Sequence, residues 1–386
     1  MPRLSMNIKK TLPNTSHRKI FVGLSGGVDS AVSAALLKKA GYNVTGVFIK
    51  VWQPDFLPCN WRDERRDAMK VAIALDIPFL FFDFEKEYKK DVADKMVAEY
   101  KVGRTPNPDV LCNREIKFGA FWKKAREMGA DFIATGHYSQ IQRFNLGTTK
   151  VKPLYRYLLK EGKDRGKDQS YFLWTLNQND LSHTCFPIGD LEKGEVRKLA
   201  RRYHLPVSEK KDSQGICFIG DVSMDEFLSH FIKTKPGKVL NTRGDIIGTH
   251  KGALLYTIGE RHGFEITKRS PEEGAFYILS KDMKANTLTV SNNELEMVLH
   301  SPTRIVVKGV NWINEFKTRQ LFARIRYRGN KLPVTVKSLA FDRVEVEFRE
   351  PVRGLSLGQS IVFYGDLDKD GASACLGGGV MDSIIK

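Results

Sequence analysis

The sequence predicts three parts: an N-terminal α/β domain built on a doubly wound parallel sheet, a small central domain that is mainly β, and a C-terminal antiparallel β-barrel. Two patterns lead to this prediction. Strand-like apolar runs alternate with helix-length runs early in the chain, and short runs of alternating polar and apolar residues follow one another late in it. We expect the parts to span residues 1–220, 221–300 and 301–386.

The N-terminal part has the periodicity of strand–helix–strand units. Its predicted strands are Lys19–Leu24, Val44–Ile49, Pro78–Phe84 and Asp131–Thr135. Its predicted helices are Ala31–Ala40, Arg62–Leu75, Tyr88–Tyr100 and Ile116–Met128. Strands that alternate with helices of this length form a parallel sheet, which binds ligands beyond the carboxyl ends of its strands.

The rest of the chain has shorter elements. We expect a short helix at Phe227–Lys233, followed by a Gly-rich stretch of short strands and turns up to Gly263. Strands of the barrel are predicted at Arg304–Val310, Leu321–Tyr327, Val334–Lys337, Val344–Phe348 and Ser360–Tyr364. Turns near Gly329 and Gly354 separate them, as is typical of a small barrel.

The composition narrows the class of protein and of partner. The chain is 41% hydrophobic and 28% charged, which is typical of a globular protein. No run approaches the roughly 18 apolar residues of a membrane span, so we expect no membrane partner. The formal net charge of +17 suggests a polyanionic partner, nucleic acid first, although a basic solvated surface gives the same balance.

The cysteines and the N-terminus suggest a compartment. Cys59, Cys112, Cys185, Cys217 and Cys375 are widely spaced with no CxxC pair, which indicates a reducing compartment and no structural metal. The first 28 residues contain basic residues and no acid. This fits a short organellar transit segment or a basic N-terminus, and the lack of an amphipathic stripe favours the second. We therefore expect a cytoplasmic protein.

The strongest chemical signal is Ser25-Gly26-Gly27-Val28-Asp29-Ser30, between the first strand and its helix. Glycines let the backbone approach phosphates closely, and the helix N-terminus favours anions. A carboxylate repels nearby phosphates unless a cation lies between them, so we assign Asp29 a magnesium-related role. The Gly-Lys-Ser/Thr ending of a Walker loop is missing. The loop resembles that of the ATP-pyrophosphatases, which cut ATP to AMP and pyrophosphate.

Two further segments carry reactive groups. In Gly103–Asn113, two prolines fix an extended chain that presents Asp109 and Cys112. We expect Cys112 beside a helix start, where the pKa of a thiol falls, although a buried structural cysteine fits the spacing equally well. Cys217 lies in a Gly-flanked turn after two lysines, where the charge favours a thiolate; packing among its apolar neighbours is the alternative.

Together these segments closely resemble the tRNA-specific 2-thiouridylases, the MnmA/TrmU family. Further matching segments occur in the same order, at 134–138, 167–172, 248–252, 323–328 and 358–360. The resemblance runs from Lys19 to near the C-terminus. It implies an adenine nucleotide alpha hydrolase-like fold for the first domain, with ATP and Mg²⁺ as cofactors, and a barrel that contacts tRNA.

The resemblance also implies roles for residues. ATP would be bound by Gly23, Leu24, Ser25, Gly26, Gly27, Val28, Asp29, Ser30, Ile49 and Gly136, with Ile49 where many relatives have Met. The target base would be surrounded by Asn107, Pro108 and Asp109, with Asp109 as general acid and base. Contacts to tRNA would come from His137, Lys167, Asp168, Gln169, Arg326, Tyr327 and Gln359.

The reaction implied is 2-thiolation of the wobble uridine, position 34, in tRNAs for Lys, Glu and Gln. ATP would adenylate the uracil O2 and release pyrophosphate. Sulfur from a cysteine desulfurase or relay protein would then pass through a persulfide on Cys217. Cys112 would assist its release by forming a disulfide with Cys217, and AMP would leave. Glu115 leaves no CxxC at Cys112, which speaks against an iron–sulfur variant.

Other functions fit parts of these patterns. A synthetase of the GMP or argininosuccinate type would need no paired thiols, and a glutamine-dependent one would need a glutaminase domain. A lysidine synthetase would use no catalytic cysteine. A non-catalytic tRNA-binding protein would not need Asp29, Asp109, Cys112 and Cys217 together.

Overall fold

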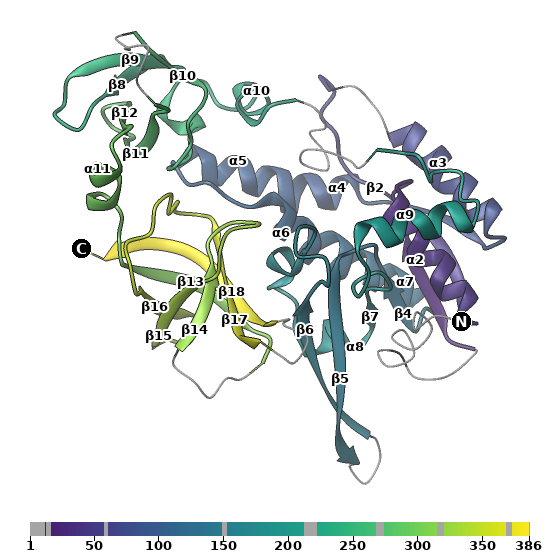
Figure 1. Ribbon diagram of the computed structural model, residues 1–386. Coiled ribbons are helices and arrows are strands. Elements are labelled where there is room, and N and C mark those ends of the chain that lie inside the picture. The colour runs from purple at the N-terminus through teal and green to yellow at the C-terminus, as the bar shows by residue number, and fades with distance from the viewer. Residues whose placement is uncertain are drawn as a thin grey trace.

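The computed structural model describes residues 12, 17–57, 61–148, 153–211, 222–267, 274–314, 320–367 and 373–385. Cys59 and Cys217 lie outside these residues. Figure 1 shows three parts: the α/β domain beside the N-terminus, the β-barrel at the C-terminus, and a small β domain above the barrel. In the described residues, no helix is both long and apolar enough to cross a membrane.

The α/β domain is built on a parallel sheet, as the alternating pattern predicts. The strands lie in the order β3 (Phe79–Asp83), β2 (Asn43–Lys50), β1 (Lys19–Gly23), β4 (Phe132–Ala134) and β7 (Thr184–Cys185). Because strand residues alternate between faces, Ile20 and Val22 of β1 lie in one hydrophobic core and Phe21 lies in another. The sheet is therefore buried on both sides, which explains its continuous apolar strands.

Helices cover both faces of this sheet. The core on one face contains residues of α2 (Val28–Lys39), α3 (Trp61–Ala74) and α9 (Lys193–Arg202). The core on the other face is built from η1 (Lys89–Ala93), α5 (Asp94–Lys101), α6 (Pro108–Cys112), η2 (Asn113–Ala120) and α7 (Phe121–Glu127). Short helices α4 (Glu85–Tyr88), η3 (Ser170–Leu173) and α8 (Gln178–Ser182) complete the domain.

One helix begins earlier than predicted. The expected start at Ile116 was wrong, because α6, η2 and α7 follow one another without a break from Pro108. Asn107 caps this helix, since its side-chain oxygen accepts a hydrogen bond from the Val110 N–H at 3.3 Å. Asparagine at the cap and proline at the first position are ordinary start signals, so the sequence contained this information.

In its described residues, the small central domain has a mixed sheet and three short helical segments. Its strand order is β10 (Phe264–Ile266), β9 (Ile246–His250), β8 (Gly237–Leu240), β12 (Thr287–Ser291) and β11 (Tyr277–Asp282). Among the described residues, its helical segments are α10 (Met224–Ser229), η4 (Ala253–Leu255) and α11 (Glu294–Leu299). The helix predicted at Phe227–Lys233 thus starts and ends earlier than expected. Its start is set by Ser223, whose side chain caps α10 by accepting a hydrogen bond from the Glu226 N–H.

The barrel is antiparallel and closed. Its strand order is β13 (Arg304–Trp312), β16 (Arg343–Phe348), β15 (Leu332–Ala340), β14 (Gln320–Arg324), β17 (Ser360–Leu367) and β18 (Ser373–Ile385). Pairing of β13 with β18 closes it, and Ile305, Phe363 and Met381 are among the side chains that fill it. The predicted fold class is confirmed for all three parts, whereas the domain limits near residues 220 and 300 stay a prediction.

Two features of the barrel were not expected. Its sheet continues through β18 into a hairpin of the N-terminal part, β6 (Pro153–Glu161) and β5 (Ser139–Thr148), which projects from the molecule (Figure 1). Arg326 and Tyr327 lie in a turn after β14, not on a strand as predicted. The strand ends there because the chain reverses at Arg328, which has a positive φ of 59°.

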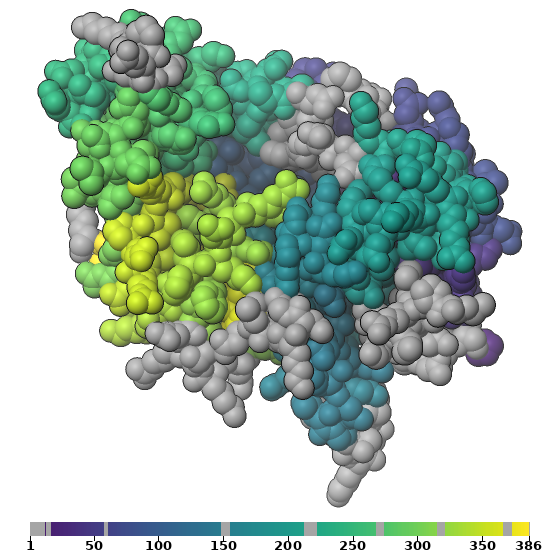
Figure 2. Space-filling view, in the orientation of Figure 1, coloured from purple at the N-terminus to yellow at the C-terminus, as the bar shows by residue number. Residues whose placement is uncertain are grey.

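The three parts form one continuous body. Figure 2 shows the blue residues of α5 set back between the green central domain and the yellow barrel. The segment after α5 is fastened to the barrel, because the Thr105 N–H donates to the Leu357 carbonyl at 2.9 Å. The N-terminal domain and the barrel thus meet beside the start of α6.

Candidate active site

The loop between β1 and α2 is shaped by its glycines and serines. Gly26 has a φ of +73°, and a Cβ there would lie 2.5 Å from the carbonyl oxygen of Glu64, so glycine is required. The Ser30 hydroxyl accepts a hydrogen bond from the Ser25 N–H and donates one to the Gly27 carbonyl, both at 3.2 Å. Helix α2 then begins without a side-chain cap, so its first N–H groups suit an anion.

Gly136 brings the end of β4 against the start of α2. A Cβ on Gly136 would lie 2.8 Å from both the Asp29 carbonyl carbon and the Ser30 nitrogen. No side chain fits at that distance from backbone, so glycine permits the close approach. The predicted loop residues and the distant Gly136 are therefore neighbours in the fold.

A cavity of about 250 Å³ opens at this place, beyond the carboxyl ends of the parallel strands. Residues predicted to bind ATP line it: Gly23, Leu24, Ser25, Asp29, Ser30, Ile49 and Gly136. Gly26, Gly27 and Val28 belong to the same loop but do not line it. The rest of its wall consists of Val47, Phe48, Val51, Gln53, Trp61, Glu64, Cys112, Ile116, Lys117, Thr135, His137 and Gln169. A wall that combines apolar and polar side chains beside a phosphate-type loop suits a nucleotide.

Asp29 is held by two residues that the sequence analysis missed. The Lys193 ammonium lies 2.7 and 2.9 Å from its two carboxylate oxygens, and the Tyr138 hydroxyl donates to one of them at 2.8 Å. Lys193 is the first residue of α9 and lies far along the chain from Asp29. No local pattern marks Lys193, whereas Tyr138 belongs to a segment that matched the family.

The surroundings of Asp29 fit a magnesium ion bound together with ATP. The Lys193 ammonium shows that a cation is stabilised against both carboxylate oxygens. Carboxylate, hydroxyl and phosphate oxygens are the ligands that Mg²⁺ prefers, and it is usually bound by one or two carboxylates with substrate phosphates. Within the described residues, no group of three or more His, Cys, Asp and Glu could hold a metal without such a substrate.

The segment predicted to surround the target base is anchored on the barrel. The Arg104 guanidinium pairs with Asp382 at 3.1 Å and donates to the Met381 carbonyl at 3.0 Å. A Cβ on Gly358 would lie 2.9 Å from the Thr105 nitrogen, so the barrel loop packs directly on this segment. The barrel therefore fixes the direction in which the chain enters Asn107.

Asp109 follows in the first turn of α6 and is half-buried. Burial raises the pKa of its carboxyl above the ordinary value, and the positive charge of Lys117 opposes this rise. Lys117 lies on η2 and lines the cavity. Lys117 was not predicted as a site residue. The structure places it on a π-helical turn, and such turns are frequent at functional sites.

Cys112 lines the same cavity and is 4% exposed. It ends α6 and lies one turn inside the continuous helix, so its predicted place beside a helix start at 116 was wrong.

Cys217 lies outside the described residues. The chain leading to it is tied to α3, because the Lys210 ammonium pairs with Asp67 at 2.8 Å. Cys185 and Cys375 are buried, and burial raises the pKa of both thiols.

Comparison with known proteins gives consistent matches along the chain. Family matches are to the tRNA methyl transferase HUP domain over 18–221, the tRNA methyl transferase PRC-barrel domain over 225–292, and the aminomethyltransferase beta-barrel domain over 280–381. The tRNA-specific 2-thiouridylase MnmA of Lysinibacillus sphaericus is 41% identical, covering 98% of this chain and 97% of that protein. The MnmA of Nitrosomonas eutropha is 43% identical over 95% of this chain and 99% of its own.

The chain belongs to the tRNA-specific 2-thiouridylase family. Two solved structures resemble it with low overlap. The U34-tRNA thiolase NcsA from Methanococcus maripaludis has a TM-score of 0.36 and 20% identity, covering 55% of this chain and 66% of that chain. A 4-thiouridine synthetase–RNA complex with bound ATP has a TM-score of 0.33 and 19% identity, covering 53% of this chain and 46% of that one. Overlaps this low support no inference about the site.

Two of the tRNA contacts that the 2-thiouridylase resemblance implies lie at the cavity. His137 is 6% exposed, and its Nδ1 lies 2.7 Å from the Thr135 hydroxyl. Burial lowers the pKa of His137 well below the ordinary value, so the ring is neutral. Gln169 also lines the cavity, and its side-chain oxygen accepts a hydrogen bond from the Tyr138 N–H at 2.9 Å.

The other implied contacts lie near the barrel. Asp168 is 3% exposed and pairs with Arg324 at 2.7 Å, while Lys167 beside it is partly exposed. Arg326 is exposed and lines a cavity of about 280 Å³ with Arg353 and His300, between the barrel and the central domain. The partly exposed ring of Tyr327 lies 4.6 Å from that of Phe172. The Gln359 carbonyl accepts from the Met381 N–H, and its side chain is partly exposed.

Proposed function

We propose that the protein catalyses the ATP-dependent 2-thiolation of the wobble uridine in tRNAs for Lys, Glu and Gln. The observation that carries this proposal is the shared cavity, which Ser25, Asp29 and Ser30 line together with Cys112. A phosphate-type loop and a thiol on one cavity suit a reaction that activates an oxygen with ATP and replaces it with sulfur. The dispersed cysteines suit a reducing compartment, and we place the protein in the cytoplasm.

The first step is activation of the base. The uracil O2 attacks the α-phosphorus of ATP, forming an O2–adenylate and releasing pyrophosphate, while Asp109 accepts the N3 proton. The raised pKa of Asp109 makes its carboxylate a stronger base than an ordinary aspartate, which suits a group that takes up and returns a proton. Asp29 would hold Mg²⁺ against the phosphates. When bound, the ion would neutralise charge on the leaving pyrophosphate.

The second step is sulfur transfer. Cys217 carries a persulfide received from a cysteine desulfurase or relay protein, and its terminal sulfur attacks C2. AMP leaves with the former O2. The Cys112 thiolate then attacks the Sγ of Cys217 and breaks the persulfide bond, so the sulfur stays on C2 and N3 regains its proton. The two cysteines become a disulfide, which an external thiol must reduce.

Binding of tRNA would use the residues around the cavity and the barrel. Asn107, Pro108 and Asp109 would surround the uracil, and His137, Lys167 and Gln169 would border it. Arg326, Tyr327 and Gln359 would contact the rest of the tRNA, with Arg326 suited to phosphates and Tyr327 to base stacking. Asp168 belongs to this set by resemblance, although its carboxylate is buried.

The activation step can be tested without a sulfur donor. With magnesium present, unmodified tRNA for Glu should stimulate the release of pyrophosphate from ATP, whereas the same tRNA already carrying 2-thiouridine should not. Both tRNAs have the same shape and charge, so the second is a matched control. Equal stimulation by both would contradict adenylation of the O2 atom.

A further inference from the structure

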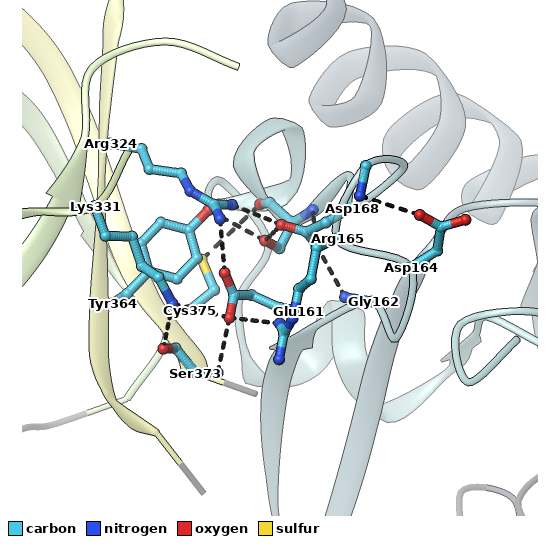
Figure 3. A network of polar contacts seen from close by, with 12 residues as sticks. Glu161, Gly162, Asp164, Arg165, Asp168, Arg324, Lys331, Tyr364, Ser373 and Cys375 are labelled. Carbon is cyan, nitrogen blue, oxygen red and sulfur yellow. Dashed lines mark hydrogen bonds and ion pairs between the residues drawn. The ribbon is translucent and has the colours of Figure 1, made fainter. Parts of the chain in front are cut away.

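Two buried carboxylates lie where the α/β domain meets the barrel (Figure 3). Glu161 ends β6 and is fully buried, and Asp168 is 3% exposed. Arg324 of β14 pairs with both, at 2.9 Å from Glu161 and 2.7 Å from Asp168. Lys331 and Arg165 pair with Glu161, at 3.1 and 2.7 Å. Because unpaired buried charges are costly, Asp168 depends on the barrel's Arg324 for compensation.

The Asp168 carboxylate also fixes its own stretch of chain. One oxygen accepts hydrogen bonds from the Gly162 N–H at 2.9 Å and the Ser170 N–H at 3.1 Å. The other accepts from the Ser170 hydroxyl at 3.0 Å as well as from Arg324. Arg324 therefore holds the whole turn between Gly162 and Ser170 through a single side chain.

This turn carries Gln169, which reaches the ATP loop through Tyr138. Gln169 and Tyr138 are joined twice: the Gln169 N–H donates to the Tyr138 carbonyl, and the Tyr138 N–H donates to the Gln169 side chain, both at 2.9 Å. The Tyr138 hydroxyl donates to Asp29 at 2.8 Å. A continuous series of contacts thus runs from a barrel strand to the carboxylate of the phosphate-type loop.

We propose that Arg324 is a positioning residue, which acts through Asp168 and Gln169 to hold Tyr138 against Asp29 and so sets the ATP-binding geometry. The barrel then has a part in binding ATP and not only in contacting tRNA. This inference rests on the proposed function only in taking the cavity's ligand to be ATP. It also gives Asp168 a role inside the protein that its burial favours over direct contact with RNA.

The test measures affinity for α,β-methylene ATP by calorimetry, with magnesium and without tRNA, so no turnover is required. Arg324→Met and Asp168→Asn should each weaken binding by about tenfold, as loss of a supporting contact does. The double variant removes one positive and one negative charge and so leaves the net charge of the cluster unchanged. It should bind no more weakly than the weaker single variant. Arg324→Lys should restore part of the loss.

Lys331→Met is the matched control, because Lys331 pairs with Glu161 and Ser373 but not with Asp168. Its affinity should stay within about twofold of the unaltered protein, whatever it does to the melting temperature. Equal losses in Lys331→Met and Arg324→Met would overturn the proposal in favour of general stability at the junction. Unchanged nucleotide affinity in Arg324→Met with weaker tRNA binding would overturn it in favour of a direct RNA contact.

The same data separate this inference from the proposed function. If the unaltered protein binds no nucleotide, the assignment of ATP to the cavity fails, and the positioning role fails with it. If the unaltered protein binds nucleotide and Arg324→Met and Asp168→Asn bind it equally well, the positioning role alone is contradicted.

Discussion

The ammonium nitrogen of Lys193 lies 2.7 and 2.9 Å from the two carboxylate oxygens of Asp29. The side chain of Lys193 is 13% exposed and that of Asp29 is 33% exposed, so the pair is partly shielded from water. A lysine in this position supplies positive charge beside the loop when no magnesium is bound. The magnesium that we propose to enter with ATP would compete with it for the same carboxylate.

Replacing Lys193 should change the magnesium requirement. With Lys193→Met, we expect half-maximal pyrophosphate release at a lower magnesium concentration, because the ammonium no longer competes for Asp29. Asp29→Asn should instead lower the rate by about two orders of magnitude at any magnesium concentration. Magnesium titrations of pyrophosphate release check both, with Lys198→Met on the exposed side of α9 as control. An unchanged titration for Lys193→Met would refute the competition.

The two thiols assigned to sulfur transfer should separate activation from thiolation. Cys217→Ser should retain tRNA-dependent pyrophosphate release and yield no thiolated product, because it cannot carry a persulfide. Cys112→Ser should also lose the product, since the sulfur would remain attached to Cys217. Cys185→Ala is the control, because Cys185 is buried away from the cavity. Thiolation by Cys217→Ser would disprove the persulfide role.

The raised pKa of Asp109 predicts how the rate of pyrophosphate release depends on pH. Its folded-state pKa is raised by burial, so the base form needed to accept the N3 proton is lost as the pH falls through that raised value. The rate of pyrophosphate release should therefore fall on the acid side, and Asp109→Asn should lose the activity at every pH. A rate profile that is flat down to the ordinary aspartate pKa of about 3.9 would contradict this.

The same shift predicts an effect on stability. A raised folded-state pKa means that the native protein binds the Asp109 proton more tightly than the unfolded chain does. Protonated Asp109 therefore contributes stability at acid pH, and the contribution is lost as the pH rises through the folded pKa. Asp109→Asn should raise the urea midpoint relative to the unaltered protein at pH 8 more than at pH 4.

Two glycines should respond oppositely to alanine. Gly136→Ala places a Cβ 2.8 Å from the backbone of Asp29 and Ser30, so both stability and nucleotide affinity should fall. Gly194→Ala, in the first turn of α9, meets nothing within 4 Å and should raise the free energy of unfolding by about 0.5–1 kcal/mol. Urea unfolding and calorimetry compare them, and normal nucleotide affinity in Gly136→Ala would argue against the close approach.

Much of the fold could be predicted because its elements have strong local patterns. The parallel strands are continuous apolar runs, and most barrel strands alternate. Strand β18 escaped prediction because its centre is a run of glycines, which usually marks a loop. These glycines are needed in β18, because larger side chains would not fit. A Cβ on Gly377 would lie 2.0 Å from the Asn311 carbonyl oxygen, and one on Gly378 would lie 2.9 Å from the Trp174 ring.

The candidate site was predictable where its residues form contiguous motifs. The loop at 25–30 and the segment at 107–112 could be found because their glycines, prolines and reactive groups lie close together in the chain. The pairs Lys193–Asp29 and Arg324–Asp168 could not be predicted, because their members lie 164 and 156 residues apart. Lys193 and Arg324 also occupy ordinary positions on a helix and a strand, which no motif marks. Such contacts are decided by tertiary packing.

The most direct test of the central claim is mass spectrometry of wobble-position nucleosides. Unmodified tRNA for Glu would be incubated with the protein, magnesium, and a cysteine desulfurase with cysteine as the persulfide source, with and without ATP. We predict a gain of one sulfur in place of one oxygen on the wobble uridine only when ATP is present. Formation of AMP on bound tRNA without any sulfur on that uridine would contradict it.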